Sequence, residues 1–152
     1  MRVLGVDYGR RRVGLALSDP SGLLASPWRT IQAGLTPGAS ATILAKLLAD
    51  ADDDEVGSLQ AIVVGLPRRL NGEDNEQTVP TRTFAAALAA ATGATVHLQD
   101  ERLSSHEAES RLAVRERDWR VRKARLDAAA AAVILQDYLD AQPRAPLTSD
   151  AD

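Results

Sequence analysis

The stretch that decides the fold of this chain is VLGVDYGRRRVGLALSD, residues 3–19. An apolar run ends at Asp7, the chain turns at Gly9, and a second run returns with alternating bulky and small residues. This pattern predicts a β-hairpin with a carboxylate near its tip, and a close packing partner on the small face formed by Gly14 and Ala16. An acid beside a glycine turn suits a metal ion or a phosphate, whereas the simpler interpretation is a solvated Asp-Gly turn.

The composition indicates one domain. The chain has 152 residues, of which 45% are hydrophobic, and it contains no cysteine. A chain of this length buries roughly two-thirds of its unfolded surface. The lack of cysteine excludes thiolate metal sites, disulfides and a thiol nucleophile. No apolar stretch reaches the ~18 residues that span a bilayer, and no signal-peptide pattern precedes the first strand, so we expect a cytoplasmic protein without membrane contact.

Charge is distributed unevenly along the chain. The net charge is -3, but five acids lie within residues 50–55, and the balance elsewhere is positive. Basic residues cluster at 10–12, at 68–69 and between 115 and 125. These clusters suit a surface that follows a phosphate backbone, or they are solvated loops.

Helices and strands alternate after the hairpin. Further strands are expected at residues 23–31, 59–67 and 94–99. Helices are expected at residues 40–49, 81–92, 104–114 and 126–141. The apolar run 59–67 is typical of a parallel strand buried on both faces, which predicts a place at the sheet centre. Residues 50–55 are predicted to be a solvated connection, and residues 115–125, which lack a helical period, a mobile loop.

Three acids stand at the ends of expected elements. Asp7 ends the first strand, Glu101 follows the last one, and Asp127 falls in the first turn of the terminal helix. They can meet only where those ends are neighbours in space. The simpler interpretations are that Glu101 pairs with Arg102 or a loop lysine, and that Asp127 complements the helix dipole.

Four sequence blocks occur in a fixed order along the chain. They are DYGRRRVGLALSD at 7–19, VGLP at 64–67 with NG at 71–72, DERLSS at 100–105 with Ala108, and KARLDAAA at 123–130 with Leu135, Tyr138 and Leu139. With these blocks the chain resembles the YqgF/RuvX family, the Holliday junction resolvase or pre-16S rRNA nuclease group of the ribonuclease H-like superfamily. Two departures are the long acidic connection and the two serines after Leu103, where threonine is frequent.

The resemblance implies an α/β, ribonuclease H-like fold. Its mixed five-stranded sheet has three antiparallel strands, then alternating helices and strands, and is flanked by helices. One nuclease domain is expected over residues 1–141, with residues 142–152 as a disordered tail. The resemblance also implies a metal-dependent endonuclease in which Asp7, Glu101 and Asp127 are catalytic and bind Mg²⁺ or Mn²⁺. Oxygen ligands without cysteine favour these ions, and a two-ion site would activate water for in-line hydrolysis.

Further residues are candidates for contacts around this site. Arg12 and Lys123 are expected to contact phosphate groups of the substrate, together with Arg120, Arg122 and Arg125. Asp100 and His106 are candidates for supporting the ligands, although an ordinary surface position is the alternative for His106. Trp119 suits stacking on a base or wedging into a junction, or packs on the domain.

Several functions remain open at this stage. The resemblance allows cleavage at the 5′ end of pre-16S rRNA during ribosome biogenesis, or resolution of Holliday junctions in recombination and repair, which requires a symmetric dimer. The expected partner is therefore structured RNA or branched DNA, and the protein is a monomer or a homodimer. A non-catalytic nucleic-acid-binding factor in transcription would need the basic clusters but not the acids. Actin-like ATPases and sugar kinases share the Asp-x-Gly block, but they need two such domains.

Overall fold

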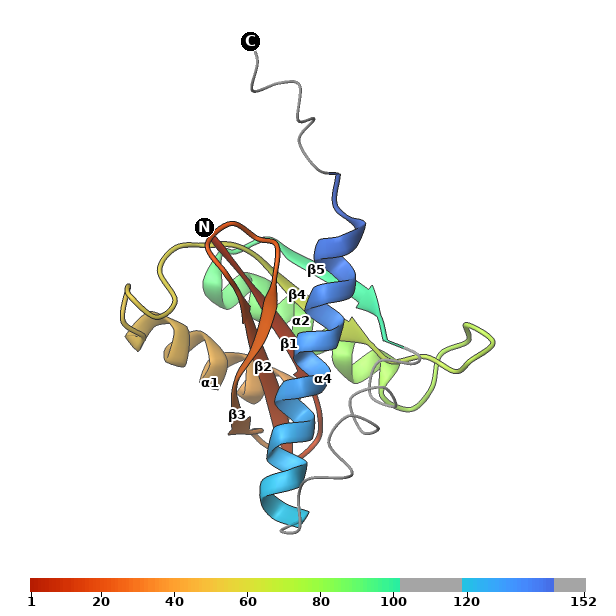
Figure 1. The fold of residues 1–152 in the computed structure, drawn as a ribbon. Coiled ribbons are helices and arrows are strands. Elements are labelled where there is room, and N and C mark those ends of the chain that lie inside the picture. Colours follow the sequence, from red (N-terminus) through yellow and green to blue (C-terminus); the bar gives the residue numbers. More distant parts are fainter. Residues whose placement is uncertain (102–118, 144–152) are drawn as a thin grey trace.

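The computed structural model describes residues 1–101 and 119–143, with the backbone alone for residues 119–125 (Figure 1). A five-stranded sheet lies between two helical layers. The strands are β1 (Arg2–Tyr8), β2 (Arg12–Ser18), β3 (Ala25–Gln32), β4 (Leu59–Leu66) and β5 (Val96–Asp100). The described helices are α1 (Pro37–Asp50), α2 (Thr78–Thr92) and α4 (Trp119–Ala141).

The sheet has the predicted mixed topology. Its strand order is β3-β2-β1-β4-β5, with β1, β2 and β3 antiparallel and with β4 parallel to both β1 and β5. The expected ribonuclease H-like class is therefore confirmed. The central strand is β1, not β4 as expected, because β4 joins the sheet between β1 and β5. The parallel pairing and near-complete burial predicted for β4 are confirmed.

The α1 and α2 layer covers the bulky face of the hairpin. Leu4, Val6 and Leu15 are fully buried there, and the ring of Tyr8 stacks on Phe84 of α2 with centroids 4.4 Å apart. The α1 helix starts three residues before the predicted position, because the Thr36 hydroxyl caps it by accepting a hydrogen bond from the Ala39 amide at 3.0 Å. These contacts make the larger half of the core.

The α4 helix lies almost directly on the sheet backbone, across glycines. A Cβ added to Gly5 of β1 would lie 2.7 Å from Leu135 Cβ, and one on Gly14 of β2 only 2.0 Å from the carbonyl oxygen of Asp127. Distances this short exclude any side chain at either position. The close packing partner predicted for the small face of the hairpin is therefore α4.

The predicted loop at residues 115–125 is wrong for its second half. Residues 119–125 are the start of α4. Arginine, lysine and alanine favour helix, and the later turns of α4 pack on the sheet, so the helix extends through these residues without an apolar period of their own. Asp127 therefore lies in the third turn of α4, not the first, where the helix dipole has little effect. The helix expected at 104–114, residues 115–118 and most of the predicted tail lie outside the described residues.

The acidic connection is also more structured than expected. Val56, which follows it, is buried, and Glu55 accepts a hydrogen bond from the Trp28 indole of β3. The Arg29 guanidinium lies 3.3 Å from the same carboxylate. One end of the segment is thus attached to the edge strand rather than simply solvated. Within the described part of the chain, no helix has the length and apolar character needed to cross a membrane.

The contact between α4 and Gly14 gives a test of the packing. Replacing Gly14 by Ala should lower the free energy of unfolding by about 3 kcal/mol or more, the upper end of overpacking effects, because backbone cannot move aside as a side chain can. Gly38→Ala is the matched control, since its added Cβ would meet only the Thr36 hydroxyl at 4.0 Å. Urea unfolding followed by circular dichroism measures both variants, and equal midpoints would contradict the close approach of α4.

Candidate active site

Asp7 lies near the end of β1 on the face that α4 covers. Side chains alternate along a strand, so Asp7 shares this face with Gly5. In the β1–β2 register Asp7 is opposite Gly14, the residue on which Asp127 of α4 rests. The same glycine therefore places both acids at this end of the sheet.

Glu101 comes to the same place from β5. Its amide donates a hydrogen bond to the carbonyl of Leu66 at 3.2 Å, which continues the strand pairing beyond β5. Its carboxylate lies over Gly65 of β4, where an added Cβ would be 2.8 Å from Oε2. Glycine at this position makes room for the acid, and the Glu101 carboxyl also shares a hydrogen bond with Asp7.

The two acids form a partly buried pair with raised pKa values. Burial raises the pKa of Asp7, and the charge of Asp127 raises it further, although the hydrogen bond from Glu101 works in the opposite direction. Burial also raises the pKa of Glu101, and the negative charges of Asp7 and Asp100 add to this. These raised pKa values favour one proton shared between Asp7 and Glu101 near neutral pH.

Asp127 is held at the edge of this pair by Arg12. The Nε of Arg12 donates to Oδ2 of Asp127 at 2.6 Å, and the two side chains are 31% and 27% exposed. Arg12 precedes Gly14 by two residues on β2, so both face α4. The backbone of Asp127 thus contacts Gly14, and its carboxylate contacts Arg12.

The residues suit a divalent ion in their chemistry. Glu101 Oε2 is buried without a hydrogen-bond partner in the described structure, and an unpaired buried carboxylate oxygen calls for a cation. Carboxylate oxygens are the ligands preferred by Mg²⁺ and Mn²⁺. The described residues contain no group of three acids or histidines already gathered for an ion, and the Asp127 carboxylate is paired with Arg12. Metal binding by the three acids stays a prediction.

Comparison with known proteins gives the family. The model of the family described as "RuvX: Holliday junction resolvase" matches residues 1–141. The chain belongs to the RuvX family. A relative from Maridesulfovibrio salexigens is 40% identical over 139 residues, covering 91% of this chain and 98% of the relative, and one from Anaeromyxobacter is 44% identical over 140 residues, covering 92% and 97%. Both are named "Putative pre-16S rRNA nuclease".

A solved structure is also similar to this RuvX chain. It is RuvC from T. thermophilus in complex with a Holliday junction substrate. The identity is 18%, the TM-score is 0.49, and the match covers 93% of this chain and 95% of that one.

The other predicted site residues are placed less completely. The backbone of Arg120, Arg122, Lys123 and Arg125 lies in the first two turns of α4, as does that of Trp119. Asp100 ends β5 beside Glu101 and affects its pKa. His106 lies outside the described residues. The phosphate contacts expected of these side chains therefore stay predictions.

Two features of the site were missed in the sequence. One is the ion pair between Arg12 and Asp127, although the two-residue spacing of Arg12 and Gly14 places both on one strand face. The other is the space that Gly65 leaves for Glu101. In the sequence, the sign of this space is the glycine that interrupts the apolar run of β4.

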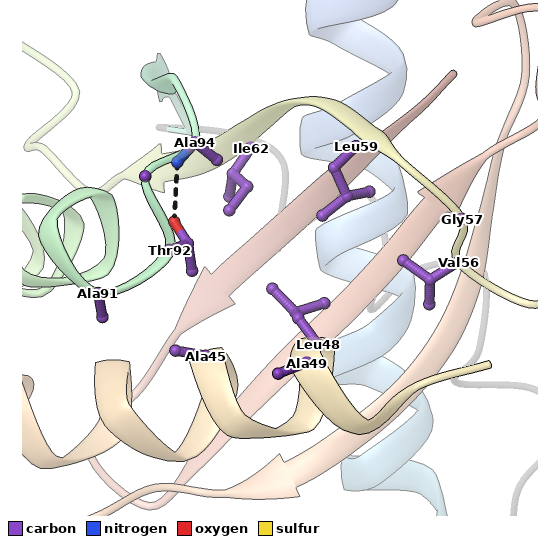
Figure 2. A pocket seen from close by; sticks show the side chains of 11 residues that line it. Ala45, Leu48, Ala49, Val56, Gly57, Leu59, Ile62, Ala91, Thr92 and Ala94 are labelled. Atoms are coloured by element: carbon purple, nitrogen blue, oxygen red, sulfur yellow. Dashed lines mark hydrogen bonds between the residues drawn. The ribbon is translucent and has the colours of Figure 1, made fainter. Parts of the chain in front are cut away.

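An open pocket of about 460 Å³ lies at the opposite end of the sheet (Figure 2). It is surrounded by Leu48 of α1, by Val56 just before β4, by Leu59 at the start of β4, and by the end of α2. Its lining consists of aliphatic residues, glycines and Thr92, whose hydroxyl accepts a hydrogen bond from the Ala94 amide. It holds no group suited to acid, base or metal chemistry, so we place the candidate site at the acids.

The raised pKa values predict how stability depends on pH. Between about pH 4 and the neutral range the folded, metal-free protein holds more protons at Asp7 and Glu101 than the unfolded chain, so stability falls as pH rises. Asp7→Asn should therefore raise the unfolding free energy at pH 8 by about 1–2 kcal/mol and flatten its pH dependence.

Asp19→Asn serves as the control from the same hairpin. Asp19 accepts hydrogen bonds from the Leu23 and Leu24 amides, which hold its pKa well below the usual value. Its stabilising effect is present above the unfolded pKa, so this variant should lose stability at pH 8. Denaturant unfolding with a chelator present measures both variants, and destabilisation by Asp7→Asn would contradict the buried like-charge pair.

Proposed function

We propose that this protein is a metal-dependent endonuclease that hydrolyses phosphodiester bonds, and that it processes the 5′ end of pre-16S rRNA. The observation that carries this is the buried pair of Asp7 and Glu101, with Asp127 beside it, at the carboxyl ends of β1 and β5. The pair is found in a RuvX chain that matches relatives named as pre-16S rRNA nucleases over nearly their full length.

The residues have separate roles in this proposal. Asp7, Glu101 and Asp127 would hold Mg²⁺ or Mn²⁺, and the proton that Asp7 and Glu101 share must leave before they do so. When bound, two such ions supply an activated water and charge stabilisation for in-line displacement at phosphorus. The arginines at the start of β2 and α4 would align the nucleic-acid backbone with the acids.

The buried acids also argue against a non-catalytic function. Two carboxyl groups held together and partly removed from water oppose each other's ionisation, and a simple nucleic-acid-binding factor would have no use for them. Sites of this kind are typical of catalytic centres. A kinase-like function is not supported either, since the described part of the chain forms one such sheet.

Holliday junction cleavage is the second candidate. The description of the matching family model names this activity, whereas the relatives at 40–44% identity are named for RNA processing. A resolvase must cut two strands symmetrically and therefore act as a dimer. We favour RNA processing because no dimer face is identified in residues 1–101 and 119–143, which the structure describes.

Cleavage assays test the proposal directly. The protein should cut a pre-16S RNA fragment in the presence of Mn²⁺ or Mg²⁺ and leave a 5′-phosphate, and chelation should abolish the activity. Asp7→Asn should reduce the rate by about a hundredfold or more, because several kcal/mol of charge stabilisation depend on the ligands. Asp53→Asn, in the exposed acidic connection, makes the same change of charge and should retain activity.

A synthetic four-way junction is assayed in parallel. Preferential cleavage of the junction by a dimer would favour the second candidate over RNA processing. Metal-dependent cleavage of neither substrate, or full activity of Asp7→Asn on either, would contradict the catalytic role of Asp7.

The basic start of α4 gives a separate prediction about binding. Neutralising Arg120, Arg122 and Arg125 together should weaken RNA binding and reduce the slope of affinity against salt concentration, because each lost phosphate contact removes released counterions. Cleavage at saturating RNA should change far less. Filter binding over a range of salt concentrations measures the slope, and an unchanged slope would remove these arginines from the interface.

A further inference from the structure

We propose that Arg12 is a positioning residue that holds Asp127 as an exchangeable ligand, so that the metal site and a phosphate site are completed together. This inference rests on the proposed function, in which Asp7, Glu101 and Asp127 hold the metal. It adds a role for Arg12 before any substrate is bound.

The first support is the position of Asp127 between two partners. Its backbone is fixed by the contact with Gly14, so its carboxylate can move only by side-chain rotation. On one side it receives the Nε–H of Arg12 at 2.6 Å, and on the other its charge is close enough to raise the pKa of Asp7. The Asp127 carboxylate therefore interacts both with the Arg12 guanidinium and with the pair formed by Asp7 and Glu101.

The second support is the charge balance of the metal-free site. Negative charge at Asp7 repels Asp127 and favours its pairing with Arg12. A divalent cation between Asp7 and Glu101 would reverse this, because it attracts the Asp127 carboxylate and repels the guanidinium. The pair of Arg12 and Asp127 would therefore open when the metal binds.

The third support is a pocket beside Arg12, where β2 pairs with β3. An open pocket of about 440 Å³ is lined there by Arg11, Arg12, Thr30, Ile31 and Gln32, from the paired strands β2 and β3. Two guanidinium groups beside a hydroxyl and an amide suit the oxygens of a phosphate. A guanidinium released by Asp127 has this pocket next to it.

These contacts predict reciprocal coupling between metal and nucleic acid. Metal binding frees Arg12 for a phosphate, and phosphate binding to Arg12 frees Asp127 for the metal. Each ligand should therefore raise the affinity for the other by the same factor, and couplings of this kind are typically about 5- to 150-fold. The coupling should depend on Arg12 and not on Arg82, an exposed arginine of α2 outside this pocket.

Titration with Mn²⁺ alone, followed by calorimetry, tests the exchange. Arg12→Gln removes the cation that competes for Asp127 and should tighten Mn²⁺ binding about tenfold, a change of about 1.4 kcal/mol. Arg82→Gln is the matched control, because Arg82 is exposed on α2, does not line this pocket and makes the same change of charge. It should alter the affinity by less than about threefold, as expected of a screened surface charge.

A purely structural role for Arg12 predicts the opposite sign. If Arg12 only supports Asp127 in a binding position, Arg12→Gln should weaken Mn²⁺ binding, and that result, or an unchanged affinity, would overturn the inference. Arg12→Lys retains the charge but not the planar donor, so it should fall between the wild type and Arg12→Gln. It gives the same test if the glutamine variant does not fold.

A second titration measures the coupling itself. The Mn²⁺ affinity is compared with and without a short 2′-O-methyl RNA, which binds without being cleaved. The RNA should tighten Mn²⁺ binding in the wild type and in Arg82→Gln, and this effect should be lost in Arg12→Gln. Coupling retained in Arg12→Gln would overturn the inference. Failure of the wild type to bind Mn²⁺ at all would instead count against the proposed function.

Discussion

The close approach of α4 to the sheet is the constraint on which the rest of the structure depends. At Gly5 and Gly14 the helix contacts strand backbone at distances that leave no room for a side chain. This contact buries Ile134 and Leu135 and forms the second half of the core. It also brings the third turn of α4 to the end of β1, so Asp127 meets Asp7 although 119 residues separate them in sequence.

The site that results is a source of instability in the metal-free protein. Asp7 and Glu101 share a proton because burial and mutual repulsion oppose their ionisation, and Oε2 of Glu101 lacks a partner in the described structure. Proteins retain such arrangements where function requires them. Arg12 offsets part of the negative charge by pairing with Asp127, whose side chain is 27% exposed. The fold thus holds the acids in place while leaving their charge incompletely compensated.

The strand ends supply the precision of the site. Asp7 lies on β1 and Glu101 directly follows β5. Both strands are parallel to β4, which lies between them, and Gly65 of β4 leaves the space for the Glu101 carboxylate. Strands fix side-chain direction more firmly than loops do, because the hydrogen-bonded register sets which face each residue takes. Asp127 comes instead from a helix that crosses this face, and its side chain has an alternative partner. The three acids therefore differ in mobility, and it is the helical one that is paired with Arg12.

The sequence by itself determined the hairpin, the parallel strand β4 and the family, because period-two alternation, an uninterrupted apolar run and ordered motif blocks are local properties. It also identified Asp7, Glu101 and Asp127 as the acids to bring together. Only the tertiary structure decided that α4 begins at Trp119, that Glu101 lies over Gly65, and that Asp127 pairs with Arg12. The last two depend on distances between residues far apart in the chain, which packing sets and local patterns do not encode. The proton shared by Asp7 and Glu101 likewise arises from burial, which exists only once the sheet and α4 have come together.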